Sequence, residues 1–183
     1  MPRTEIRVSF NFSGGWNAGS AGFSEMAKDP EKRKSFVDSL VPYLQRFGFQ
    51  GLDLDWEGPA FGEGSDPAVD KADFSLLVDE IKTAFEPEGL VLSLALLVLP
   101  EKADAAYDVP YIAERADFLN LMAYDYHGWW SGHEYTGMES PILSRPEEVN
   151  PAHPAYQRTV YSTLVYYINA GKSLITLQKI KIG

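Results

Sequence analysis

Apolar stretches alternate along this chain with segments in which apolar residues recur at helical spacing. Strand-like runs occupy residues 6–15, 49–57, 90–99, 117–128 and 177–183. Helical periodicity is found at residues 29–47, 70–86, 107–116 and 153–171. The strand-like runs are almost continuously apolar, which is typical of parallel strands covered by helices. The pattern therefore predicts a parallel α/β fold.

Two of the predicted helices have clear sequence signals. Asp29 followed by Pro30 indicates an N-cap and a first helical position, and apolar residues then recur as far as Gly48. Pro42 inside this run lacks the backbone N–H that a helix needs, so we expect a kink or a break there. In the helix at 70–86, one face carries the apolar residues Phe74, Leu77, Val78, Ile81 and Phe85.

The second strand-like run carries three carboxylates at alternate positions, Asp53, Asp55 and Glu57. With the two-residue period of a strand they share one face, about 6 to 7 Å apart from one position to the next. The other face, which we expect to pack against the helices, carries Leu52, Leu54 and Trp56. A charge run is most often a solvated face. In so apolar a strand, however, three like charges cost several kcal/mol unless they are paired, protonated or functional.

Composition and charge narrow the classes of protein and ligand. The chain has 183 residues, of which 45% are hydrophobic and 13% aromatic, enough for the core of one globular unit. Its net charge of -10 argues against nucleic-acid binding and favours a neutral or cationic ligand. The apolar run at 90–100 is too short to cross a membrane, and the N-terminal residues lack the apolar segment of a secretory signal.

A metal site is the alternative reading of the carboxylate cluster, because clustered carboxylates bind magnesium or calcium. The chain has no cysteine and no phosphate-cradling glycine loop. Its histidines, His127, His133 and His153, have no ligand spacing on one helix face. We therefore predict no metal and no cofactor.

The sequence "GLDLDWE" resembles the catalytic strand of glycoside hydrolase family 18, the chitinases and chitinase-like proteins. Three further segments resemble family segments in the same order: "SFNFSGGWNAGS", "LMAYDYHG" and "YTGMESPIL". The resemblance implies a (β/α)8 TIM barrel, of which residues 1–183 form a single partial catalytic domain with about strands 3 to 7. Because an unclosed barrel leaves open sheet edges, we expect this chain alone to associate and to be a poor enzyme.

The resemblance also implies substrate-assisted hydrolysis of β-1,4-linked N-acetylglucosamine polymers, with no protein nucleophile. Glu57 would protonate the leaving oxygen, and a raised pKa would suit that role. Asp55 would bind the acetamido N–H, and Asp53 would share a proton with Asp55. Tyr124 would donate its hydroxyl to the acetamido oxygen.

Further residues are expected to line the sugar site: Trp16, Met122, Asp125, Tyr126 and Trp129. A core position is a comparable alternative for Trp16, for Trp129 and for Trp130. Two positions depart from the family pattern. Gln50 stands where the family has its first aspartate, and Gly58 follows the acid where an aromatic residue is usual.

Two other functions remain open at this point. A non-catalytic lectin that binds chitooligosaccharides has a similar sequence, but in such lectins the acid is typically replaced, and Glu57 is present here. An endo-N-acetylglucosaminidase acting on N-glycans uses the same chemistry with different outer loops. The expected partners are chitin or chitooligosaccharides, with no nucleic acid and no membrane, and the family resemblance implies an extracellular location.

Overall fold

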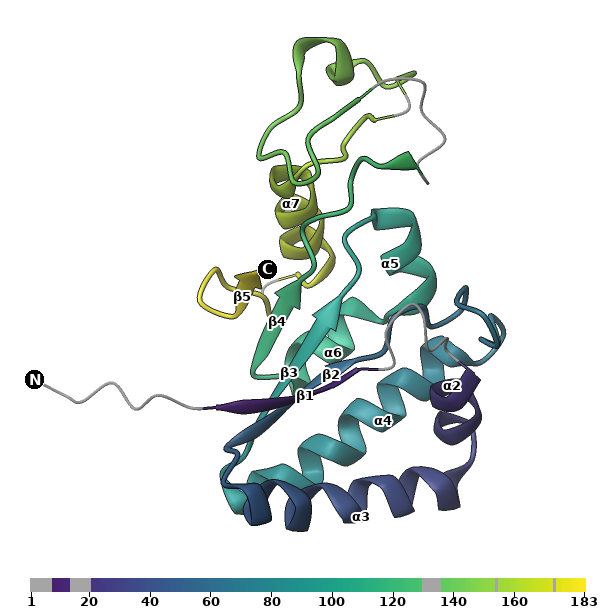
Figure 1. The fold of residues 1–183 in the computed structure, drawn as a ribbon, viewed down its shortest axis with the longest axis vertical. Coiled ribbons are helices and arrows are strands. Elements are labelled where there is room, and N and C mark those ends of the chain that lie inside the picture. Colours follow the sequence, from purple (N-terminus) through teal and green to yellow (C-terminus); the bar gives the residue numbers. More distant parts are fainter. Residues whose placement is uncertain (1–7, 14–20, 130–135, 154, 173) are drawn as a thin grey trace, which may run out of the picture.

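The computed structural model describes residues 8–13, 21–129, 136–153, 155–172 and 174–183. Within these residues the chain forms one parallel sheet of five strands, whose spatial order is the same as their order in the sequence (Figure 1). The strands are β1 (Ser9–Ser13), β2 (Gly51–Asp55), β3 (Val91–Leu96), β4 (Phe118–Leu121) and β5 (Ile180–Ile182). This arrangement confirms the predicted parallel α/β class.

Helices connect the strands, as the alternating pattern predicts. They are α2 (Ala21–Ala27), α3 (Pro30–Phe47), α4 (Asp70–Phe85), α5 (Pro100–Ala106), α6 (Val109–Arg115) and α7 (Val160–Ala170), with short 3-10 turns at η1 (Glu86–Glu88) and η3 (Pro146–Val149). Helices α3 and α4 lie side by side and contact each other (Figure 1). None of the helices among the described residues combines the length and the apolar character needed to cross a membrane.

The core lies between the sheet and this helical layer. Every residue predicted for the apolar face of α4 is fully buried: Phe74, Leu77, Val78, Ile81 and Phe85. From β2 and the residue after it, Leu52, Leu54 and Trp56 point into the same core, with at most 1% of each side chain exposed. The predicted packing face of β2 is therefore confirmed.

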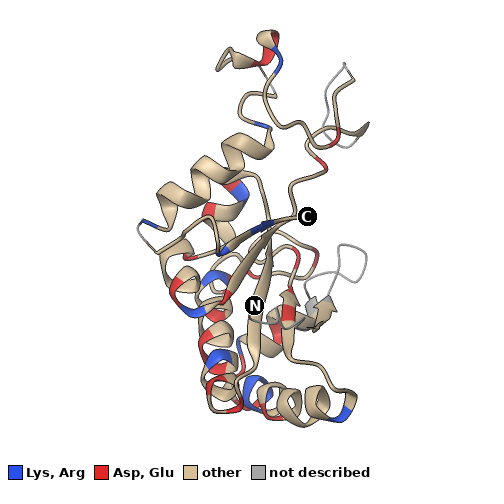
Figure 2. Ribbon diagram, turned by 90° about the vertical axis from the view of Figure 1, so that its left-hand side faces the viewer, with Lys and Arg blue, Asp and Glu red and all other residues tan. Residues whose placement is uncertain are grey.

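Acidic and basic residues are interspersed over the helical layer (Figure 2). Arg33 of α3 pairs with Glu80 of α4 at 3.0 Å, and Arg115 of α6 pairs with Asp79 of α4 at 2.5 Å. The pair of Arg115 with Asp79 is partly exposed and contributes only a small part of the stability, whereas Arg33 is buried. Both pairs fix which faces of neighbouring helices meet.

Helix α3 begins where the sequence predicts, but it does not break. Oδ1 of Asp29 accepts hydrogen bonds from the N–H groups of Glu31 and Lys32 at 2.9 and 3.3 Å, and Gly48 ends the helix with φ 73°. The helix runs without interruption through Pro42, so the break is wrong and the kink stays a prediction. Pro42 is exposed, and water can therefore bind the backbone carbonyl that the proline leaves unpaired.

Two helices were not predicted, and two boundaries differ from the prediction. Helices α2 and α5 are short, seven residues each, and carry too few periodic positions to be recognised. Strand β4 ends at Leu121 instead of continuing to residue 128. Helix α7 begins at Val160, after Thr159 as N-cap, and not at residue 153. Because Thr159 and Ser162 form a capping box, this local signal sets the start of the helix.

Candidate active site

The carboxylates of the second strand lie at the carboxyl end of the sheet. Asp53 and Asp55 belong to β2, and Glu57 follows two residues after the strand ends. All three side chains are half-buried, whereas the residues between them are buried. In a parallel sheet this edge is where loops from several strands converge, so it is where a barrel of this type places its chemistry.

Asp53 is held by three side chains from three other strands. Its Oδ2 accepts a hydrogen bond from Asn11 of β1 at 2.9 Å. Its Oδ1 accepts from Ser93 of β3 at 2.6 Å and from Asn120 of β4 at 2.7 Å. These donors stabilise a carboxylate that apolar strands surround, and they fix its orientation.

Sequence reasoning did not single out Asn11, Ser93 or Asn120. Each is a polar residue inside an otherwise apolar strand, and Asn11 and Ser93 are in register with Asp53 on the two adjacent strands. A comparison of polar positions that share one face across neighbouring strands would have found them. The three residues show that the inner face of this sheet is polar beyond the carboxylates of β2.

Tyr124, three residues after β4, interacts electrostatically with the β2 carboxylates. Its side chain is 40% exposed. Burial raises the pKa of the Tyr124 hydroxyl above its ordinary value. The negative charges of Glu57 and Asp55 raise this pKa further, and the charge of Asp125 adds to the effect. The Tyr124 hydroxyl after β4 therefore lies within range of the negative charges at the end of β2.

The other residues expected to line a sugar site differ in how far they are exposed. Met122 is half-buried, with its N–H bonded to Leu96 O at 3.0 Å. Asp125 is exposed and has a left-handed backbone with φ 58°. Trp129 is 91% exposed, so the core alternative for it is wrong. Trp16 and Trp130 lie outside the described residues.

Tyr126 is a core residue, which corrects its expected place at the substrate. None of its side chain is exposed, and its hydroxyl forms a 2.6 Å hydrogen bond with Thr163 of α7. The sequence predicts a strand over residues 117–128, which includes Tyr126. Because β4 ends at Leu121 and Asp125 has a left-handed backbone, Tyr126 lies outside the strand and packs into the core.

The two departures from the family pattern have local structural explanations. Gln50 precedes β2, and its Oε1 accepts a hydrogen bond from the Val8 N–H at 2.9 Å while its Nε2 donates to Gly48 O. Gln50 therefore ties the start of β2 to residues near β1. Gly58 has φ 96°, a backbone conformation that favours glycine directly after Glu57.

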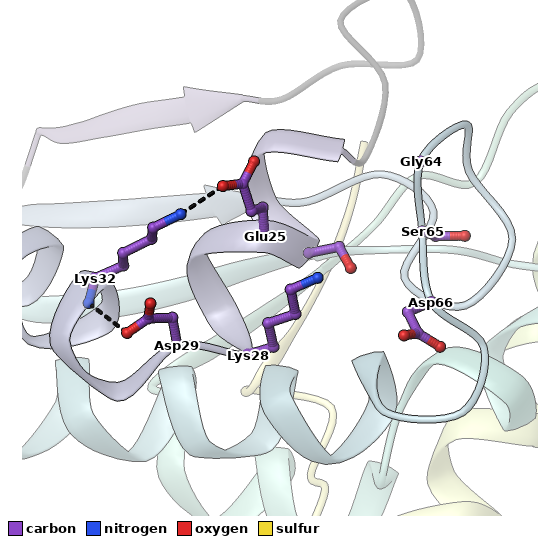
Figure 3. A pocket seen from close by; sticks show the side chains of 8 residues that line it. Glu25, Lys28, Asp29, Lys32, Gly64, Ser65 and Asp66 are labelled. Atoms are coloured by element: carbon purple, nitrogen blue, oxygen red, sulfur yellow. Dashed lines mark hydrogen bonds and ion pairs between the residues drawn. The ribbon is translucent and has the colours of Figure 1, made fainter.

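A pocket of about 550 Å³ lies between α2 and residues 64–66 (Figure 3). Its lining consists of Ser24, Glu25, Lys28, Asp29, Lys32, Gly64, Ser65 and Asp66. Lys32 is paired with Glu25, and no residue predicted for the active site lines the pocket. The pocket is thus separate from the carboxylates of β2.

Across the described ranges, no group of three or more His, Cys, Asp or Glu side chains could hold a metal ion.

Comparisons with known proteins agree with this architecture. Residues 3–183 match the family described as Glycosyl hydrolases family 18. Mouse chitotriosidase-1 is 40% identical over 146 residues, which cover 76% of this chain and 31% of that protein. The chitinase TsES1 from Trichuris suis is 35% identical with a TM-score of 0.84, over 99% of this chain and 47% of that one.

A solved structure of human YKL-39 is also similar, at 25% identity and a TM-score of 0.84, over 97% of this chain and 47% of that one. It is described as a pseudo-chitinase with retained chitooligosaccharide binding properties. The chain spans less than half the length of these relatives. The parallel sheet is therefore part of a TIM barrel, and the chain belongs to glycoside hydrolase family 18.

Proposed function

We propose that this protein hydrolyses the β-1,4 links of chitin or chitooligosaccharides, with Glu57 as the proton donor. The observation that carries the proposal is the position of Asp55 and Glu57 at the carboxyl end of β2, with the Tyr124 hydroxyl after β4 within range of their charge. A phenol and two carboxylates can together bind an acetamido group and protonate the neighbouring glycosidic oxygen. Resemblance to chitotriosidase-1 and to the chitinase TsES1 supports the same substrate class.

The first step breaks the glycosidic bond without a protein nucleophile. The acetamido oxygen of the substrate attacks the anomeric carbon and forms an oxazolinium ring, while the glycosidic oxygen leaves with the proton of Glu57. Asp55 accepts the acetamido N–H and stabilises the positive charge of the ring. Tyr124 donates its hydroxyl to the acetamido oxygen and orients it for attack.

The second step returns the enzyme to its first state. Glu57, now a carboxylate, takes a proton from water, and the oxygen of that water attacks the anomeric carbon. The ring opens to give back the acetamido group. Two inversions at the anomeric carbon give net retention of configuration. Asp53, two residues before Asp55 on the same face of β2, is held in place by Asn120 and its other donors.

The remaining contacts follow from exposure and chemistry. Trp129 offers an exposed aromatic face on which a sugar ring can stack, and Met122 and Asp125 lie near Tyr124 along the chain. Trp16 is assigned the same stacking role on its sequence position beside Gly14 and Gly15. An extracellular location belongs to this proposal through the family resemblance.

A comparison of acetylated and deacetylated oligomers tests the substrate-assisted route. The protein that carries this chain should cleave chitotetraose and leave the fully deacetylated tetramer intact, because only the first supplies the attacking oxygen. Proton NMR of the fresh products should show the β anomer. Equal rates on the two oligomers, or an α anomer formed first, would refute the mechanism.

A lectin function is the second candidate, because human YKL-39 combines a similar fold with chitooligosaccharide binding. Glu57 argues against it, since the proton donor is retained in this chain. The two functions separate in one experiment, in which chitotetraose is incubated with the protein and the mixture is examined for products. Binding by calorimetry with no shorter oligomers would favour the lectin, and accumulation of dimer would favour the enzyme.

A further inference from the structure

The backbone directly after Glu57 is in an uncommon conformation. Gly58 has φ 96° and Ala60 has φ 70°, and Ala60 is 8% exposed. An alanine pays a steric penalty in this left-handed region, so other contacts must hold it there. The turn that follows the proposed proton donor is therefore set by its surroundings and not by its own preference.

One buried carboxylate supplies these contacts. Asp70, the first residue of α4, has none of its surface exposed. Its Oδ2 accepts hydrogen bonds from the N–H groups of Ala60 at 3.0 Å and Asp66 at 2.9 Å. Its Oδ1 accepts the hydroxyl of Ser24 at 2.6 Å. Asp70 thus joins the turn after β2, the loop before α4 and helix α2.

Helix α2 also holds the residue before Glu57. Phe23 stacks on Trp56 with the ring centroids 5.4 Å apart and an interplanar angle of 9°. Trp56 is 1% exposed and makes a second aromatic contact with Phe74 of α4. In the close view of the neighbouring pocket, Asp66 lies on the loop that faces α2 (Figure 3). Glu57 consequently lies between two anchored points, Trp56 and Ala60.

We propose that Asp70 is a positioning residue that sets the direction of the Glu57 carboxyl group. It does not contact the substrate. It holds the left-handed turn at residues 58–60, and through Ser24 it links that turn to helix α2. The proposal rests on the proposed function, in which Glu57 transfers the proton, and it assigns a role to a residue outside the carboxylate strand.

The test compares Asp70→Ala and Asp70→Asn with a matched control, Asp117→Ala. Asp117 also accepts a backbone N–H, from Leu92 at 2.8 Å, and pairs with Lys82 at 2.9 Å, but it lies before β4 at the opposite end of the sheet. Asp70→Asn should be a rescue variant. Its amide oxygen can accept both backbone N–H groups, while its amide nitrogen donates to the Ser24 oxygen.

Rates are measured on chitotetraose well below the melting temperature, and near-UV circular dichroism confirms the folded state. For Asp70→Ala we expect kcat to fall about a hundredfold with KM nearly unchanged, because a small misplacement of a reacting group has this effect. Asp70→Asn should recover most of kcat. Asp117→Ala should lower the melting temperature and leave kcat unaffected. A folded Asp70→Ala variant with wild-type kcat, or an equal kcat loss in Asp117→Ala, would overturn the positioning role.

A second readout separates this role from the proposed function. In the wild type, amide hydrogen exchange should be slow at Ala60 and Asp66, and the NMR titration of the Glu57 carboxyl should change in Asp70→Ala but not in Asp117→Ala. These results would support the positioning role even if the wild type cleaved no chitotetraose, which would refute the function alone. If Asp70→Ala does not fold, amide hydrogen exchange in the wild-type protein tests the proposal instead. Exchange at Ala60 and Asp66 that is as fast as in an open loop would overturn the positioning role.

Discussion

Asn120 of β4 donates a hydrogen bond to Asp53 of β2 across the intervening strand β3, with Nδ2 and Oδ1 2.7 Å apart. The contact links two strands that are not neighbours in the sheet. It shows that the inner face of this sheet is held together by polar groups, while the outer face is held by apolar packing.

Asn120→Asp should destabilise the protein at neutral pH by about 1–3 kcal/mol, because it places a second carboxylate beside Asp53 and removes a donor. The close pair holds one proton more readily in the folded state than in the unfolded chain, so the lost stability should return as the pH falls from 7 toward 4. Urea unfolding across this range measures it. Asn169→Asp, an exposed change in the last turn of α7, is the control and should show a much smaller recovery, because only the helix dipole acts on its charge.

Gly51→Ala should destabilise the protein by about 1–3 kcal/mol through overpacking. A Cβ atom at Gly51 would lie 2.4 Å from the backbone oxygen of Val91, where β2 and β3 approach each other closely. Gly22→Ala in α2 is the matched control. It meets no heavy atom within 4 Å and should be neutral or add about 0.5–1 kcal/mol. Equal effects of the two changes on thermal unfolding would contradict the close approach of the strands.

Glu148 of η3 should contribute stability that is lost in acid. Burial alone would raise its pKa, but hydrogen bonds from the Arg145 side chain and backbone outweigh burial and lower the pKa. With a folded pKa below the unfolded value of about 4.3, its contribution is full above that value and disappears as the pH falls through the folded pKa. Glu148→Gln should lower the free energy of unfolding by about 1–3 kcal/mol at pH 7. It should also make the free energy of unfolding depend less on pH in acid. Glu147→Gln, an exposed change beside it, should do neither.

Tyr124→Phe and Tyr126→Phe form a matched pair that separates chemistry from stability. Tyr124→Phe should lower kcat on chitotetraose about tenfold to a hundredfold, because it removes the donor to the acetamido oxygen. Tyr126→Phe removes a buried hydrogen bond to Thr163 and should cost about 1 kcal/mol of stability with kcat unchanged. Steady-state kinetics and thermal melts of both variants measure this. A kcat loss only in Tyr126→Phe would reverse the two assignments.

The sequence predicts those parts of the fold that strong local signals determine. The cap at Asp29, the glycine stop at Gly48 and the buried face of α4 follow from helix chemistry and periodicity, and the structure confirms each of them. The carboxylate alternation in β2 is equally clear, because a two-residue period can be read without knowing the neighbours. Such features depend on residues close together in the chain.

Features that depend on distant residues were missed. The end of β4 at Leu121 depends on where the adjacent strands end, and Tyr126 therefore lies outside the strand that the sequence predicts over residues 117–128. The donors to Asp53 are up to 67 residues away, so only the sheet order brings them together. Association of a polypeptide of only these residues stays a prediction, with β1 and β5 as the two sheet edges in the described part of the chain.

The most direct test of the central claim is the turnover of chitotetraose by Glu57→Gln, in the protein that carries this chain. The variant keeps the shape of the side chain but has no acidic proton, so kcat should fall about a hundredfold to ten-thousandfold while calorimetry shows retained binding of the oligomer. Glu63→Gln, an exposed change in the loop after β2, should leave kcat unchanged. If Glu57→Gln keeps wild-type turnover, Glu57 is not the proton donor and the account is wrong.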